Sequence, residues 1–256
     1  MNQFLFNKSF IFKDGVYQSL ESESKFTAFE LAYLNVRQKE KRVLSIEEIK
    51  QLPFVDKSSS DYHLWKIRRK NIDRILKYLS NKKQLSILDI GCGNGFFPNA
   101  MALQNHQICG LDVNLTELKQ AAVAFPNKNI DWVMADIFEN ALSDAKFDLI
   151  TFCTSFHYFK DADQTIRRCL SLLKNGGEIH IIDSPFYDEE KLEEAKNNTI
   201  NYYHKMGVES MQSYFHHIAF SVFKNYQIKV IYQPRRWINK ILHRTDSPFY
   251  WIKITV

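Results

Sequence analysis

The chain has 256 residues, of which 45% are hydrophobic and 25% charged, and its formal net charge is +5. Such a composition can bury a large core and lacks the low hydrophobicity of disordered chains. Its longest unbroken apolar run, residues 121–125, is far too short for a membrane-spanning helix, which needs about 20 residues. The first residues lack the basic lead and apolar stretch of a secretory signal. We therefore expect a cytoplasmic protein with no membrane span.

The cysteine pattern and the charge distribution exclude further classes. The four cysteines, at 92, 109, 153 and 169, form no CxxC pair, so neither a disulfide framework nor a zinc knuckle is indicated. His216 and His217 are adjacent, so they cannot both ligate a metal from one helix face, and no metal site is expected. Residues 81–183 carry 9 Lys and Arg against 12 Asp and Glu. Because nucleic-acid-binding domains are usually basic on one face, we expect no nucleic-acid partner.

Residues 1–60 are predicted to be an N-terminal extension of hairpin and helices. Two short apolar runs flank Asp14-Gly15, which is typical of a β-hairpin over residues 10–17. Helical patterns follow at residues 28–39 and 45–51, and residues 55–61 have the composition of a linker. We expect this extension to be a scaffold or one wall of a substrate pocket.

Residues 61–256 are predicted to form the main domain, in which strands and helices alternate. A helix is expected over residues 62–79, and helices near 97–105, 114–125 and 166–173 separate five strands. Such alternation indicates a doubly wound, mostly parallel sheet. A helical insertion is expected over about residues 188–223, and two final β-rich runs would add an antiparallel edge strand. The predicted fold class is thus an α/β, Rossmann-like sheet of seven strands, at residues 86–90, 107–113, 130–135, 147–153, 178–183, 227–233 and 249–255.

A glycine loop stands where the first of these strands meets its helix. Residues 89–95 read Asp-Ile-Gly-Cys-Gly-Asn-Gly, and glycines let a ligand approach main-chain N–H groups closely. Ligands of open α/β sheets bind at the carboxyl ends of the strands. A dinucleotide fingerprint, G-x-G-x-x-G, would need glycine at position 96, where this chain has Phe96. A nicotinamide-dependent oxidoreductase is therefore a distant alternative.

This loop and four later motifs resemble those of the class I S-adenosylmethionine (SAM)-dependent methyltransferases. The later motifs are the strand ends at residues 110–114 and 134–137, the strand and loop at 147–159, and the turn at 172–178. The likeness is to the small-molecule branch that includes ubiquinone and menaquinone methyltransferases. It implies that SAM is the cofactor and that Asp112 binds its ribose, while Asp136 and Ile137 bind its adenine. The cofactor-binding residues implied in this way are Asp89, Gly91, Cys92, Gly93, Gly95, Asp112, Val113, Asn114, Asp136, Ile137 and Cys153. An acid such as Asp112 or Asp136 could equally cap the helix or loop that follows it.

Other side chains are candidates for the methionine end of SAM and for the acceptor. Arg68 could reach the SAM carboxylate from its helix. His157 follows the fourth strand and is the first candidate for a general base, unless it only packs behind the loop. Tyr202, Tyr203 and His204 of the insertion are candidate substrate contacts or, alternatively, packing residues of a lid.

The function indicated is methyl transfer from SAM to a small-molecule acceptor by in-line displacement. Two alternatives remain open. The basic flanks would suit an RNA or protein methyltransferase, and the lack of an unmistakable base would suit a non-catalytic SAM-binding regulator. The acceptor, the atom methylated and the oligomeric state are not indicated by the sequence.

Overall fold

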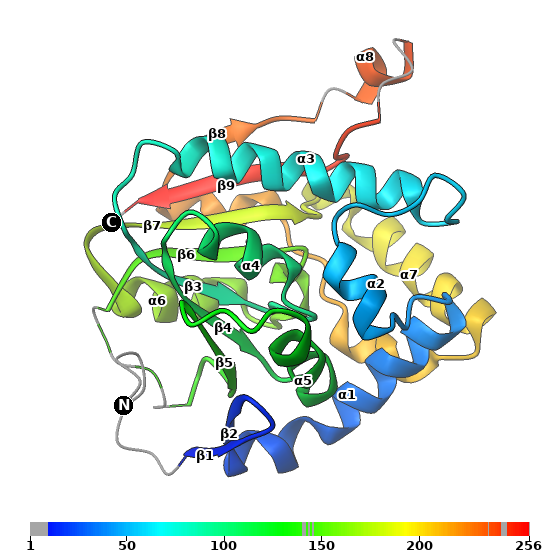
Figure 1. The fold of residues 1–256 in the computed structure, drawn as a ribbon. Helices are drawn as coiled ribbons and strands as arrows, with labels where there is room; N and C mark the ends of the chain where they lie inside the picture. The colour runs from blue at the N-terminus through cyan, green and yellow to red at the C-terminus, as the bar shows by residue number, and fades with distance from the viewer. Residues whose placement is uncertain are drawn as a thin grey trace.

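The structure is a computed structural model that describes residues 10–139, 142, 144, 146–234, 236–241 and 245–255. Residues 1–9 of the predicted extension lie outside this part. Within it the chain forms one sheet of nine strands in the order β1-β2-β5-β4-β3-β6-β7-β9-β8 (Figure 1). The predicted doubly wound α/β fold is confirmed, although two more strands join the sheet than the seven expected.

Five parallel strands form the centre of the sheet. They are β5 (Ile130–Met134), β4 (Gln107–Asp112), β3 (Ser86–Ile90), β6 (Phe147–Cys153) and β7 (Leu173–Ser184). Strands β3, β4, β5 and β6 lie close to their predicted ranges because their residues are mostly buried and largely apolar. Strand β7 starts earlier than predicted, since Leu173 pairs with Phe147 before an irregularity that contains Gly176 at φ +77°.

The two sheet edges carry antiparallel pairs. At one edge β9 (Tyr250–Thr255) lies antiparallel between β7 and β8 (Gln227–Tyr232), as the last two apolar runs predicted. At the other edge the hairpin of β1 (Phe10–Lys13) and β2 (Val16–Ser19) turns through Asp14 and Gly15, which both have positive φ. Strand β2 then pairs in parallel with β5, which accounts for the two extra strands.

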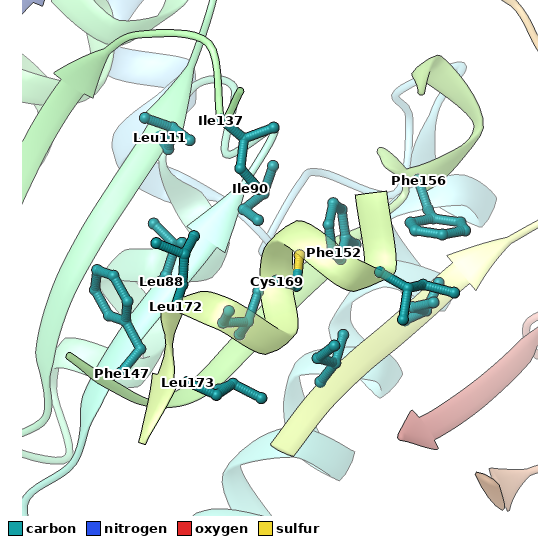
Figure 2. Close-up of a cluster of buried hydrophobic side chains, with 14 of the residues drawn as sticks. Leu88, Ile90, Leu111, Ile137, Phe147, Phe152, Phe156, Cys169, Leu172 and Leu173 are labelled. Atoms are coloured by element: carbon teal, nitrogen blue, oxygen red, sulfur yellow. The ribbon is translucent and has the colours of Figure 1, made fainter. Parts of the chain in front are cut away.

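Helices cover both faces of the sheet (Figure 1). One face is packed by α3 (Tyr62–Leu79), α4 (Phe96–Ala102) and α5 (Leu115–Ala124), whose apolar residues share one core cluster. The other face is packed by α6 (Ala162–Leu172), and Figure 2 shows its Cys169 and Leu172 among sheet residues such as Leu88 and Phe147. Helix α4 ends before the predicted residue 105, and Asn105 adopts a left-handed φ of +65°.

Helix α1 (Leu20–Lys39) begins eight residues before the predicted helix. The Ser19 side chain caps it by accepting a hydrogen bond from the Ser22 amide. The buried hydroxyls of both serines donate to the Glu139 carboxylate, which fixes the first turn of α1 beside the end of β5. The short helix α2 (Ile46–Gln51) follows, with the predicted Ser45 start and a full capping box.

The predicted helical insertion is present after β7. It contains α7 (Leu192–Met206) and three 3₁₀ turns, η2 (Glu189–Lys191), η3 (Glu209–Tyr214) and η4 (Phe220–Asn225). Another such turn, η1 (Phe156–Tyr158), follows β6, and α8 (Arg236–Ile241) connects β8 to β9. Helix α7 and η3 pack together and against α1, so the insertion and the N-terminal extension form a joint cap at one end of the sheet.

A buried polar network ties α3 to the β7–β9 edge. The Glu178 carboxylate accepts hydrogen bonds from Tyr78 and Lys253, each at 2.8 Å, and its Oε2 lies 3.2 Å from His180 Nε2. Burial alone would raise the pKa of Glu178, but hydrogen bonds from His180, Lys253 and Tyr78 outweigh it and hold the pKa well below its usual range. The ionised carboxylate therefore stabilises the fold.

We predict that Glu178→Gln lowers the free energy of unfolding at pH 7 by about 1–3 kcal/mol, because a charged acceptor of several hydrogen bonds is lost. A carboxyl whose pKa is lower in the folded state stabilises that state fully at pH values above its unfolded pKa, near 4.3. This contribution to the free energy of unfolding fades as the pH falls below that value. Urea unfolding at pH 7 and at pH 3 would measure the free energy of unfolding of wild type and variant. We expect the gap between these two free energies to be smaller at pH 3 than at pH 7. The exposed Glu190→Gln is the control, and a gap that widens in acid would contradict the prediction.

Candidate active site

A cavity of about 460 Å³ lies at the carboxyl ends of β3, β4, β5 and β6. One wall consists of the loops that follow these strands, as expected at this edge of a parallel sheet. The opposite wall comes from α1 and α3, with Phe29, Tyr33 and Arg37 on α1 and Arg68 on α3. The N-terminal extension thus lines the cavity that the glycine loop opens into.

The glycine loop is held in a conformation that only small residues allow. Gly91 has φ +72°, and a Cβ there would lie 2.4 Å from the Cβ of Ser155. Gly93 has φ +53°, and a Cβ there would lie 2.9 Å from Oε2 of Glu117. Glycine is therefore required at both positions by the backbone conformation and by the neighbouring side chains, and both residues line the cavity.

Asp112 ends β4 and connects the loops on either side of the cavity. Its carboxylate accepts hydrogen bonds from the Gly93 amide at 2.7 Å and the Asn114 amide at 2.8 Å. Burial raises the pKa of Asp112, and the amides of Asn114, Gly93 and Val113 oppose that rise. Because a carboxylate has about four acceptor positions, these two bonds leave capacity for two hydroxyls of a ligand. Helix capping and ligand binding are thus compatible at this residue.

Asp136 lies after β5 and is partnered from α1. Its carboxylate forms an ion pair with Lys25, accepts a bond from the Phe138 amide at 3.1 Å and lines the cavity with Ile137. The hydrogen bond to Asp136 raises the pKa of Lys25. A ligand amino group that approached Asp136 would therefore share its carboxylate with Lys25.

Arg68 carries a charge that the cavity does not satisfy. Its Nε is buried and has no hydrogen-bond partner among the described residues. Its guanidinium lies over the Trp65 ring at 4.6 Å, and burial lowers the pKa of Arg68. A buried guanidinium Nε–H without an acceptor is costly, and a ligand carboxylate would remove that cost.

Glu117 is a functional candidate that the sequence analysis did not identify. It lines the cavity beside Gly93, and no hydrogen bond to its carboxylate is found in the described part of the chain. Burial raises the pKa of Glu117 to about 7, against the opposing charge of Arg37. Its place after Asn114 suggested only a capping box, and no signal in the sequence indicated that α1 would approach it.

His157 lies in the cavity wall, at the end of the chain segment that follows β6. Its ring packs against Tyr158 and Phe215, with centroids 4.3 and 4.7 Å away. Its Nδ1 is buried and has no hydrogen-bond partner in the part of the chain that the structure describes. Burial, with smaller effects from Arg37, His216 and His217, lowers the pKa of His157 to about 3. The imidazole is therefore neutral and a weak base, and its predicted catalytic role stays a prediction.

The sequence-predicted cofactor residues lie together, with one exception. Gly95 does not line the cavity; it begins α4 at φ +82°, and a Cβ there would lie 2.5 Å from the Trp132 ring, so its glycine is needed for packing. The candidates that do line the cavity are Arg68, Asp89, Gly91, Cys92, Gly93, Asp112, Val113, Asn114, Asp136, Ile137, Cys153 and His157. Among these residues, burial raises the pKa of the Asp89 carboxyl to about 8.

The three predicted substrate contacts of the insertion lie elsewhere. Tyr202 and Tyr203 line a second cavity of about 430 Å³ between α1 and α7. Tyr33, Arg37 and Tyr158 line both cavities, so the two are neighbours. His204 lines neither of them, since its side chain is 78% exposed on the outer side of α7. Over the described residues no cluster of His, Cys, Asp and Glu could hold a metal ion.

Comparisons with known proteins find methyltransferases. Residues 88–181 match the family model described as a methyltransferase domain. An uncharacterized methyltransferase of Mycobacterium tuberculosis is 28% identical over 96 residues, which are 38% of this chain and 49% of the relative. A ubiquinone biosynthesis O-methyltransferase of Citrobacter koseri is 30% identical over 96 residues, 36% of this chain and 40% of the relative. The chain thus spans about half or less of the length of these curated relatives.

Solved structures share the fold at low sequence identity. The YcgJ protein of Bacillus subtilis superposes with a TM-score of 0.56 at 16% identity, over 73% of this chain and 98% of that one. The plantazolicin methyltransferase BpumL, solved with S-adenosylhomocysteine (SAH), gives 0.52 at 16% identity, over 92% and 99%. Residues 88–181 thus match a methyltransferase domain, and the fold is the one these SAM-dependent methyltransferase structures share. No helix in the described ranges is long and apolar enough to cross a membrane.

We predict that Asp112→Ala weakens SAH binding on the order of 10- to 100-fold, because hydrogen bonds to a charged group contribute about 1.5–3 kcal/mol. Isothermal titration calorimetry would measure the change. Asp163→Ala on the exposed start of α6 is the matched control and should bind SAH as wild type does. Unchanged affinity in Asp112→Ala would exclude its carboxylate from the ligand site.

We also predict that SAM binding at pH 7 releases protons and grows tighter from pH 6 to 8. The positive sulfonium favours the ionised form of Glu117, which is about half protonated at its pKa near 7. Asp89, with a pKa of about 8, adds to the release. Calorimetry in buffers of different ionisation enthalpy counts the protons. The Glu117→Gln variant should release about half a proton less than wild type on binding SAM. The control Glu47→Gln, at an exposed position, should release the same number of protons as wild type. Equal proton release by all three proteins would contradict the prediction.

Proposed function

We propose that this protein transfers a methyl group from SAM to a small-molecule acceptor. The observation that carries the proposal is one cavity lined by the glycine loop, the Asp112 carboxylate and Arg68, whose Nε has no hydrogen-bond partner among the described residues. A bare backbone, an acceptor for hydroxyls and an unsatisfied guanidinium match the three polar parts of SAM.

Each of these residues would bind a distinct part of SAM. Arg68 would neutralise the carboxylate, and Asp89 with the glycine loop would hold the amino group. Asp112 would accept from the ribose hydroxyls, and Asp136 with Ile137 would hold the adenine. When bound, SAM supplies a methyl group on a positive sulfur, which is intrinsically electrophilic. The protein then has to orient the acceptor in line with the carbon–sulfur bond and exclude water.

In the transfer, an electron pair of the acceptor atom forms the new bond to the methyl carbon. The carbon–sulfur bond breaks with its electrons returning to sulfur, and any acceptor proton leaves. Glu117 is placed to take that proton, since its carboxylate faces the cavity and its pKa lies near 7. Arg37 lies close enough to affect that pKa, and it would stabilise an acceptor that becomes anionic.

The enclosure of the cavity supports a small acceptor. Helix α1 and the insertion cover the end of the sheet, and the aromatic side chains Phe26, Phe29, Tyr158 and Tyr214 line the space beyond the glycine loop. An RNA strand or a folded protein would need a more open surface and, for RNA, a basic one. One curated relative is named for ubiquinone biosynthesis, which is consistent with a small acceptor. We also propose that residues 1–60 act as the cap of this site.

Calorimetry with SAM and SAH tests the proposal, followed by transfer from methyl-labelled SAM to small molecules extracted from cells. We expect both ligands to bind and label to appear in the small-molecule fraction. Absence of binding by either ligand at high micromolar concentration would refute the function. Label that appears only in RNA or protein would favour the alternative acceptors, and binding without any transfer would favour a regulator.

A further inference from the structure

The second cavity, between α1 and α7, has the features of a ligand site rather than of a packing defect. Its volume of about 430 Å³ far exceeds the voids of a close-packed interior and falls in the range of small-molecule sites, about 300–1,000 Å³. Its lining combines the buried Tyr203 and Met211 with Tyr202, which is 47% exposed. The cavity therefore reaches from the surface to buried side chains.

The second cavity shares part of its wall with the cofactor cavity. Tyr33, Arg37 and Tyr158 line both spaces, and Arg37 donates a 2.6 Å hydrogen bond to the Tyr33 hydroxyl. Glu40 lies 3.4 Å from Arg37 and accepts a 2.6 Å bond from the Tyr202 hydroxyl. A continuous polar chain therefore runs along the cavity, from the exposed end at Tyr202 to the junction with the cofactor cavity.

The walls of the second cavity are aromatic rather than aliphatic. Its lining includes six aromatic rings, those of Tyr33, Tyr158, Tyr187, Tyr202, Tyr203 and Phe215. The rings of Tyr33 and Tyr158 meet at 80° and those of Tyr158 and Phe215 at 84°, with centroids 6.1 and 6.4 Å apart. Faces and edges of rings are both available here, and this favours a flat aromatic ligand over an aliphatic one of the same size.

We propose that the second cavity binds the methyl acceptor, and that the acceptor is a planar aromatic molecule whose reacting atom lies at the junction formed by Tyr33, Arg37 and Tyr158. This inference rests on the proposed function, because it assigns the second substrate of the same reaction. It gives α7 and α1 a shared role, in which each contributes one wall of the acceptor site. Arg37 then lies beside both the acceptor and the cofactor.

The test uses two alcohols with the same carbon skeleton, 2-naphthol and decahydro-2-naphthol, titrated by calorimetry into the full chain with and without saturating SAH. We expect 2-naphthol to bind roughly tenfold more tightly than its saturated counterpart. Ala195→Trp would place a ring in the cavity and should weaken 2-naphthol binding at least roughly tenfold, with SAH affinity unchanged. Asn197→Trp, on the exposed side of α7, is the matched control and should behave as wild type.

Equal binding of the two alcohols would overturn the aromatic assignment. Wild-type binding of 2-naphthol by Ala195→Trp would overturn the assignment of the cavity, and Thr199→Phe repeats this arm if thermal unfolding shows Ala195→Trp to be misfolded. If the wild-type chain does not bind SAH, that result would instead refute the proposed function. In that case selective 2-naphthol binding that Ala195→Trp abolishes would still support an aromatic site between α1 and α7.

Discussion

The candidate site depends on one carboxylate that holds two loops in place. Asp112 accepts from the amides of Gly93 and Asn114, so the loops after β3 and β4 are fixed relative to each other. Because these two bonds orient the carboxylate, they also set the directions from which a ligand hydroxyl can donate to it. Because Gly93 has a left-handed φ and has Glu117 pressed against it, the loop has little freedom to adopt another shape. The shape of this wall of the cavity is therefore fixed by the loops at the ends of β3 and β4.

The parallel core and the acids at its strand ends could be predicted from the sequence for a physical reason. Strands β3 and β6 are buried on both faces, so their apolar runs are continuous and their limits are sharp. The carboxyl ends of parallel strands meet at one edge, which brings Asp89, Asp112 and Asp136 around one space although they are far apart in the chain. Local patterns are sufficient for this part of the site.

The N-terminal part could not be predicted as well, because its contacts are polar and distant in sequence. The first turns of α1 carry no apolar stripe; they are held by Ser19 and Ser22 on Glu139 and by Lys25 on Asp136. These partners are more than 100 residues apart. Arg37 of α1 and Glu117 of α5 are also distant in sequence, yet they lie close enough for the charge of Arg37 to lower the pKa of Glu117. Residue types alone gave no reason to bring these groups together.

His157 and Glu117 show how burial can change which residue type titrates near neutral pH. Histidine titrates near neutral pH in water, and glutamate does not. Burial disfavours the charged form of each, so it moves their pKa values in opposite directions. It lowers the pKa of His157 to about 3 and raises that of Glu117 to about 7. Of these two cavity residues, Glu117 is therefore the one able to exchange a proton near pH 7.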